Sequence, residues 1–231
     1  MRLKRLQAPA FWRVPKKTKK WVVAPSPGPH KKFESVPLAV VLRDLLHLVS
    51  TGEEARTIVK AGEILVDGKK RKDYGYPVGL FDVVSIPKTG QYYRAVPGEK
   101  GLKFIIVPSD EADKKISKVV DKTTIRKGKL QLNLNDGKNI LVDKTEYKTG
   151  DSLLLQIPKL KILEHVKLEK GKLGIVTKGV NAGKIGTVKS LVETKTRGQK
   201  ASVDFDGSVQ EILVNRFVIV GDKKPLITLG E

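Results

Sequence analysis

A glycine-rich stretch between residues 175 and 188, IVTKGVNAGKIGTV, holds residue types that bind phosphate. Gly179, Gly183 and Lys184 suggest a nucleotide-binding loop, in which backbone amides and a lysine cradle the phosphates. Such a loop has four residues between its glycines and a hydroxyl residue after the lysine. Here three residues separate the glycines and Ile185 follows Lys184. The stretch departs from the nucleotide-binding pattern at both positions.

The residues around this loop favour strands rather than helices. A nucleotide-binding loop must lead into a helix, and the GxxG loop of a KH module must join two helices. Ile175 and Val176 precede the loop, and the β-branched pair Thr187 and Val188 follows it. We therefore expect the turn of a β-hairpin, in which glycine permits positive φ. Two lysines become candidate phosphate contacts, Lys184 projecting from the tip and Lys178 near it.

Net charge points to a polyanionic partner. The 231 residues carry a formal charge of +20, with a sequence pI near 10.0. Lysine and arginine that neutralise phosphates release condensed counterions, so nucleic acid is the expected partner. Residues 1–36 hold ten Lys and Arg against one Glu, a net +9. Because Pro9, Pro15, Pro25, Pro27 and Pro29 exclude a long helix, we expect an extended basic arm that is disordered in the free protein.

Aromatic side chains between these cations suit RNA, where a ring stacks on an unpaired base. Trp12 and Trp21 can serve in this way or anchor the arm to the body of the protein. His30 can contact RNA or cap a turn. The candidate RNA contacts of the arm are Arg2, Lys4, Arg5, Trp12, Arg13, Lys16, Lys17, Lys19, Lys20, Trp21, His30, Lys31 and Lys32.

Other kinds of site lack the residues they need. The sequence has no cysteine and three scattered histidines, so we predict no disulfide, no metal site and no cofactor. No catalytic constellation is present, and we predict no enzymatic activity. The apolar runs fall short of a membrane span of about 18 residues, and the basic start lacks the apolar region of a signal peptide. We expect a cytoplasmic protein.

Residues 37–90 predict a compact RNA-binding unit. Apolar spacing predicts a helix over 37–49, and Thr51 with Glu54 forms a capping box for a second helix that ends at Gly62. A strand follows at 64–66, then an Asp67-Gly68 turn, the cationic run 69–72 and a further strand at 81–86. Two short helices before GEILVDGKKRKDYGYPVGLFDVVSI resemble the S-four RNA-binding fold.

That resemblance implies an RNA-binding face. It departs from the usual pattern at Gly52, where an arginine often stands, so that contact cannot be transferred. The remaining candidates on this face are Arg43, Arg56, Lys60, Lys69, Lys70, Arg71 and Lys72. The run from 69 to 72 is alternatively a solvated turn.

The rest of the chain is predicted to be mostly β. Residues 91–165 alternate apolar and polar positions around an Asn135-Asp136-Gly137 turn, with one helix expected between Pro108 and Val120. Residues 166–231 contain strand, glycine-rich turn and strand, which resembles the KOW motif of a small SH3-like barrel. The sequence therefore predicts a mainly β, multidomain α+β protein with four parts, an extended arm over 1–36, an S-four-like domain over 37–90, a central β domain over 91–165 and a KOW barrel over 166–231.

The order of these parts is more specific than any single match. Together with LKRLQAPAFW and GPHKKFESVPL, it resembles the archaeal and eukaryotic type of small-subunit ribosomal protein four, with the archaeal type favoured by the short length. This resemblance implies a non-enzymatic structural component that binds small-subunit ribosomal RNA during assembly, contacts neighbouring ribosomal proteins and does not form homo-oligomers. The alternatives are an RNA-modifying enzyme of the pseudouridine synthase type and a KOW-containing transcription elongation factor.

Overall fold

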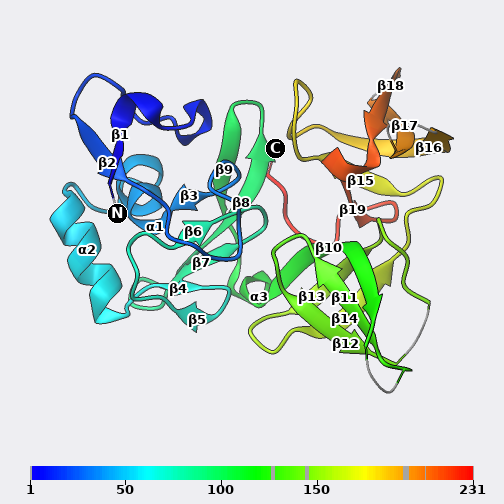
Figure 1. The fold of residues 1–231 in the computed structure, drawn as a ribbon, viewed down its shortest axis with the longest axis horizontal. Helices are drawn as coiled ribbons and strands as arrows, with labels where there is room; N and C mark the ends of the chain where they lie inside the picture. Colours follow the sequence, from blue (N-terminus) through cyan, green and yellow to red (C-terminus); the bar gives the residue numbers. More distant parts are fainter. Residues whose placement is uncertain (1, 126–127, 144–145, 195–197, 206, 231) are drawn as a thin grey trace. The chain divides into compact units, whose positions relative to one another are not determined.

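The computed structural model of the protein describes residues 2–125, 128–143, 146–194, 198–205 and 207–230. The chain forms two compact units (Figure 1). The first contains residues 1–96 and 100–113, and the second contains residues 97–99 and 114–231. Strands supply most of the regular structure of both units.

The first unit combines short strands with three short helices. Its elements are β1 (Arg2–Lys4), β2 (Trp21–Val23), β3 (Val36–Pro37), α1 (Leu38–Val40), α2 (Gly52–Ala61), β4 (Leu65–Val66), β5 (Lys69–Lys70), β6 (Pro77–Val78), β7 (Val83–Ile86), β8 (Gln91–Gly98), β9 (Gly101–Ile106) and α3 (Ser109–Ala112). The last residues of β8, from Pro97, are grouped with the second unit.

The N-terminal segment is folded into the first unit, which corrects the expectation of an extended arm. β1 and β2 pair antiparallel (Figure 1), and Leu3 lies opposite Val22 in their register. Trp12 and Val22 are buried in one apolar core with Leu38 and Val59. The prolines exclude a long helix, as expected, but they do not prevent short strands and 3₁₀ turns from burying apolar side chains.

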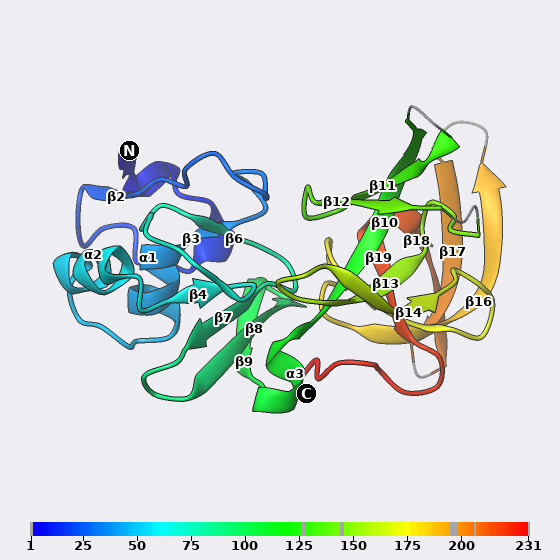
Figure 2. The ribbon, with the colours of Figure 1, turned by 90° about the horizontal axis from the view of Figure 1, so that it is seen from below.

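The two predicted helices are present, and the first is shorter than expected. α1 begins after Pro37 and continues as one π-helical turn over Val41–Leu45, and the chain then turns at His47, whose φ is +52°. The prediction that the helix extends to residue 49 was wrong. α2 has the predicted capping box between Thr51 and Glu54 and ends at Gly62 in the left-handed conformation. α1 and α2 pack against each other on the core (Figure 2).

A five-stranded sheet in the order β5-β4-β7-β8-β9 completes this unit. The predicted Asp67-Gly68 turn joins β4 to β5, with φ of +51° and +70° at the two positions. Both values fit a two-residue turn of type I′. The domain boundary predicted at residue 90 falls between β7 and β8, which are paired in this sheet.

The second unit is built from two five-stranded sheets. The strands of the first sheet are β10 (Lys114–Thr124), β11 (Leu130–Leu134), β12 (Asn139–Val142), β13 (Ser152–Gln156) and β14 (Lys161–Val166), and those of the second are β15 (Leu173–Val176), β16 (Ile185–Thr194), β17 (Gly198–Phe205), β18 (Ser208–Leu213) and β19 (Phe217–Gly221). The prediction of one helix between Pro108 and Val120 holds only for α3 and was wrong for the residues after it. Residues Lys114–Thr124 form β10, because pairing with β13 and β11 places Ile116 and Val119 in buried positions of the sheet.

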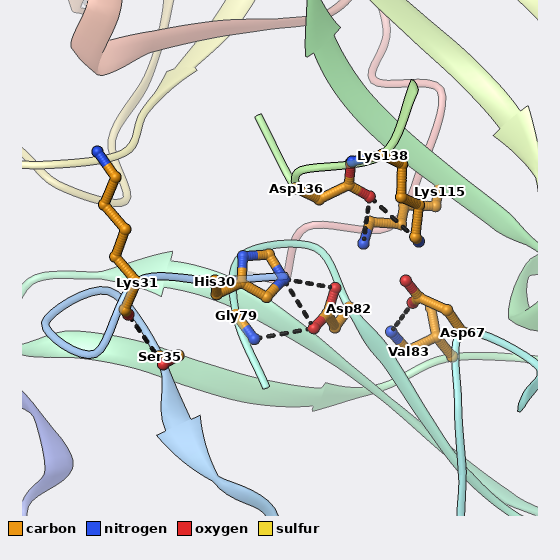
Figure 3. A network of polar contacts seen from close by, with 10 residues as sticks. All are labelled: His30, Lys31, Ser35, Asp67, Gly79, Asp82, Val83, Lys115, Asp136 and Lys138. Atoms are coloured by element: carbon orange, nitrogen blue, oxygen red, sulfur yellow. Dashed lines mark hydrogen bonds and ion pairs between the residues drawn. The ribbon is translucent and has the colours of Figure 1, made fainter. Parts of the chain in front are cut away.

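An ion cluster lies beside the predicted Asn135-Asp136-Gly137 turn, which joins β11 to β12. The carboxylate of Asp136 is 3.1 Å from the Nζ atoms of both Lys115 and Lys138. Figure 3 draws both ion pairs. Burial raises the pKa of Asp136, but the two ammonium groups outweigh it and hold that pKa below its usual value. The turn residue therefore has a second role as the partner of a buried lysine.

The second sheet runs β18-β17-β16-β15-β19, with every neighbouring pair antiparallel. Two of its glycines are required by close packing. A Cβ at Gly174 would lie 2.2 Å from the ring of Phe217, and one at Gly186 would lie 2.6 Å from the carbonyl oxygen of Asp204. The sheet can curve tightly because no side chain occupies these positions.

Candidate nucleic-acid interface

A cationic surface lies on α2 and on the segment that follows it. The side chains of Arg56, Lys60, Lys69, Lys70 and Lys72 are exposed. A Cβ at Gly62 would lie 3.6 Å from Cε of Lys72, so the end of the lysine run passes beside the end of α2. We refer to these five residues with Arg71 as the α2–hairpin face.

Two guanidinium groups of this face are held over tyrosine rings. The Cζ atom of Arg56 is 5.2 Å from the ring centroid of Tyr74, and that of Arg71 is 4.3 Å from the ring centroid of Tyr76. Cation–π contact fixes a planar guanidinium against the ring while its edge can still donate hydrogen bonds. This arrangement suits phosphate recognition, which uses such edge donors in pairs.

Arg43, the remaining candidate of the predicted S-four face, is paired locally. Its Nε and Nη2 atoms donate to the carboxylate of Asp44 at 3.2 and 2.6 Å, and its side chain is 18% exposed. A Cβ at Gly52 would lie 3.2 Å from Nη1 of Arg43. The guanidinium of Arg43 therefore occupies the start of α2, at the position where the resemblance led us to expect an arginine in place of Gly52.

The N-terminal segment presents most of its predicted contacts to solvent. Its exposed candidates are Arg2, Lys4, Arg13, Lys16, Lys17, Lys19, Lys20, Trp21, Lys31 and Lys32. The ring of Trp21 is exposed, and Nζ of Lys20 lies 5.5 Å from its centroid. The ring remains accessible for stacking beside a cation.

Three other candidates of this segment face inward, and for Trp12 this agrees with the alternative that it anchors the segment to the body of the protein. Trp12 is fully buried, and its Nε1 donates to the carbonyl oxygen of Ser35 at 2.9 Å. Arg5 is buried and donates to the carbonyl oxygen of Pro15 at 2.9 Å. Nε2 of His30 is 2.9 Å from the carboxylate of Asp82 (Figure 3). Short-range sequence patterns do not reveal these partners, because they lie up to 52 positions away.

The glycine-rich loop is a hairpin turn, as expected. β15 and β16 flank it, with Ile175 opposite Ile185. Gly179 and Gly183 have φ of +104° and +90°, and the amide of Gly183 donates to the carbonyl oxygen of Val176 at 2.8 Å. Lys178 and Lys184 are exposed, but Lys184 lies at the base of the turn, where its carbonyl oxygen accepts from the Val176 amide at 3.0 Å. Val180, 95% exposed, lies nearer the tip.

Comparison with known families divides the chain into three matched regions. Residues 1–33 match the RS4NT domain, residues 36–84 match the S4 domain, and residues 89–162 match ribosomal family S4e. Small ribosomal subunit protein eS4 of Archaeoglobus fulgidus is 48% identical over 98% of this chain and 97% of its own length.

The chain belongs to ribosomal protein family S4e.

Further relatives agree with this assignment. Small ribosomal subunit protein eS4 of Methanothermobacter thermautotrophicus is 42% identical over 98% of the S4e chain and 95% of its own length. The crystal structure of the 30S ribosomal protein S4e from Thermoplasma acidophilum has a TM-score of 0.71 and 28% identity, and the match covers 82% of this chain and 96% of that one.

The S4e chain is thus a ribosomal protein of the small subunit, in a family whose members are structural rather than enzymatic. The matches support neither a pseudouridine synthase nor a transcription elongation factor. Within the described ranges, no helix has the length and apolarity to cross a membrane, and no group of three or more metal-ligating side chains occurs.

Sequence reasoning missed three residues that hold candidate side chains in place. Tyr74 and Tyr76 support the arginines, and Asp82 fixes His30. The alternation in KDYGYPVG places Tyr74 and Tyr76 two positions apart, and that spacing was the available signal in the sequence. Asp82 follows a glycine-containing turn and carries no comparable signal.

Proposed function

We propose that this S4e protein binds small-subunit ribosomal RNA through the α2–hairpin face and the exposed cations of residues 2–36, and thereby supports assembly of the subunit. The observation that carries the proposal is the pair of guanidinium groups held over Tyr74 and Tyr76, beside exposed lysines. A surface with fixed cations loses little conformational entropy when it binds phosphate.

The two kinds of cation have different roles in this proposal. Lys60, Lys69, Lys70 and Lys72 neutralise phosphates and release counterions, which makes affinity strongly salt-dependent. Arg56 donates hydrogen bonds from a fixed plane, and so orients the RNA backbone on the face. Both contacts position RNA without reading its sequence.

The second unit contributes another RNA contact in the proposal. Its C-terminal sheet is a KOW module with an SH3-like barrel over residues 166–231, preceded by a central β domain over 91–165. Support comes from the antiparallel order β18-β17-β16-β15-β19 and from the hairpin turn that exposes Lys178 and Lys184. The protein acts as a non-enzymatic monomer within cytoplasmic ribosomes, and neighbouring small-subunit proteins are its other partners.

The experiment compares two triple variants of equal charge in filter binding to small-subunit ribosomal RNA over a range of salt concentrations. Changing Lys69, Lys70 and Lys72 to alanine should weaken affinity and flatten the dependence of log K on log salt, by about 0.9 for each duplex phosphate that is no longer neutralised. The matched control changes Lys88, Lys172 and Lys200, each of which is ion-paired with a carboxylate. Equal salt slopes for the two variants would reject the α2–hairpin face as the binding surface.

A further inference from the structure

The turn over residues 31–34 displays an exposed phenyl ring that the proposed RNA contacts do not include. Phe33 is 72% exposed, although phenylalanine is among the residues most often buried. Lys31 and Lys32 precede it and are also exposed, and Nζ of Lys32 lies 5.8 Å from the ring centroid. Two cations and one aromatic ring thus share a single short turn.

Buried contacts hold the turn at both ends. Before it, His30 is bound to Asp82, whose Oδ2 also accepts from the amide of Gly79 at 2.9 Å. The side chains of His30 and Asp82 are 6% and 2% exposed. Figure 3 shows both contacts of the Asp82 carboxylate, which hold the entry to the turn.

After the turn, Ser35 is fully buried, and its carbonyl oxygen accepts from Trp12 Nε1. Its hydroxyl donates to the carbonyl oxygen of Lys31 at 2.9 Å, and the Glu34 amide donates to the same oxygen at 2.9 Å. In Figure 3 the Lys31 side chain extends away from this network. The backbone is therefore fixed while the side chains of residues 31–33 point to solvent.

We propose that Phe33 is a stacking platform for an unpaired RNA base, with Lys31 and Lys32 on the phosphates beside that base. This inference rests on the proposed RNA-binding function and adds a single-stranded contact to it. Stacking on an aromatic ring is tolerant of sequence because every base has a π-face. A preformed turn lowers the ordering cost of such a contact.

Size and charge favour RNA over a protein partner for this turn. One phenyl ring buries about 150–250 Å², far less than the roughly 800 Å² that each side of a stable protein interface contributes. Residues 1–36 carry a net +9, which complements a phosphate backbone. A protein partner would instead recognise Phe33 by its apolar volume, and the test separates the two.

The test uses the full-length protein and fluorescence anisotropy. The probes are a labelled oligoadenylate about ten nucleotides long and a blunt RNA duplex of the same length. Phe33→Ala should weaken binding of oligoadenylate about tenfold and leave the duplex unchanged. Phe33→Trp should retain affinity, whereas Phe33→Leu should lose it, because leucine keeps apolar volume without a π-face. Ile106→Ala is the matched control, since Ile106 is 71% exposed.

A second variant tests the cations. Changing Lys31 and Lys32 to alanine should lower the salt slope for oligoadenylate by about 0.7 for each single-strand phosphate that is no longer neutralised. An unchanged slope would show that the two lysines do not bind the phosphates.

Two failures are distinguishable. If the wild-type protein binds neither probe nor ribosomal RNA in a salt-dependent manner, the proposed function itself fails. If the wild type binds RNA, two results would overturn only the stacking platform: Phe33→Ala binds oligoadenylate as tightly as the wild type, or Phe33→Leu keeps full affinity for it. An apolar contact with a protein then becomes the better account of Phe33. Because the side chain is exposed, thermal unfolding of the variants should match that of the wild type.

Discussion

The ammonium group of Lys118 donates a hydrogen bond to the backbone carbonyl oxygen of Phe217 at 2.8 Å, although the two residues are 99 positions apart. The same group donates to the carbonyl oxygen of Val214. Lys118 lies on β10, and Phe217 begins β19. A buried lysine thus joins the two sheets of the second unit.

The burial of this ammonium group predicts a rise in stability with pH. Burial lowers the pKa of Lys118 from 10.5 to about 8. Between these values the unfolded chain holds a proton that the folded protein has released, so the free energy of unfolding increases as pH rises. The contribution of Lys118 has a slope of up to about 1.4 kcal/mol per pH unit.

Urea denaturation from pH 7.5 to 10.5 should show the rise in the wild type and a smaller one in Lys118→Met. Parallel curves would contradict the prediction, and Lys161→Met is an exposed control.

A second prediction concerns the space beside His30. A Cβ at Gly79 would lie 2.2 Å from Cγ of the His30 ring, so Gly79→Ala should destabilise the protein by about 3 kcal/mol through overpacking. Truncation of the ring relieves the clash, and Gly79→Ala should therefore cost much less in a His30→Ala background. Denaturation of the four proteins in this double-mutant cycle measures the coupling. Additive costs would show that the ring does not limit the space at Gly79.

The cap of α2 gives a third prediction. Thr51 accepts a hydrogen bond from the Glu54 amide at 3.2 Å, and Glu54 accepts from the amides of Ser50 and Thr51. Thr51→Ala should reduce the free energy of unfolding by about 1 kcal/mol, whereas Thr51→Ser should retain most of it. The amide hydrogen bonds lower the pKa of Glu54, so its stabilising effect is present above the unfolded pKa and is lost as pH falls through the folded value. Equal stability of the serine and alanine variants would exclude the capping contribution.

The glycine-rich loop gives a fourth prediction. Lys184 is one exposed cation at the base of a hairpin turn, so Lys184→Ala should change the salt slope of RNA binding by about one phosphate contact or less. The wild-type protein should release no phosphate from ATP or GTP. Nucleotide hydrolysis that disappears in Lys184→Ala would reinstate an enzymatic loop.

Sequence patterns predicted the elements governed by local chemistry. The capping box at Thr51, the turn at Asp67-Gly68 and the hairpin around Gly183 each depend on residues a few positions apart, and each is present. Patterns misled where distant pairing decided the outcome. Residues 114–120 have a helical spacing, but pairing of β10 with β13 and β11 draws them into a sheet.

The residues of the candidate site also fall into those that the sequence could identify and those that it could not. Exposed cations such as Lys69 and Lys16 could be identified from charge alone, because nothing in the fold hides them. Arg5, Trp12 and His30 could not be separated from them, since their partners Pro15, Ser35 and Asp82 become neighbours only after folding. Net charge therefore identifies the partner class, while burial determines which side chains can meet it.

The guanidinium at the start of α2 has a consequence for comparing relatives. The S-four pattern led us to expect an arginine where Gly52 stands, yet the structure places Arg43, from nine residues earlier, within 3.2 Å of where a side chain at that position would begin. A cationic group can thus occupy the same place in the fold although it comes from a different position in the sequence. Substitutions at the two positions should covary among relatives. A search for this interface in relatives should therefore compare where cationic groups lie in the structures, rather than which residue types stand at aligned positions.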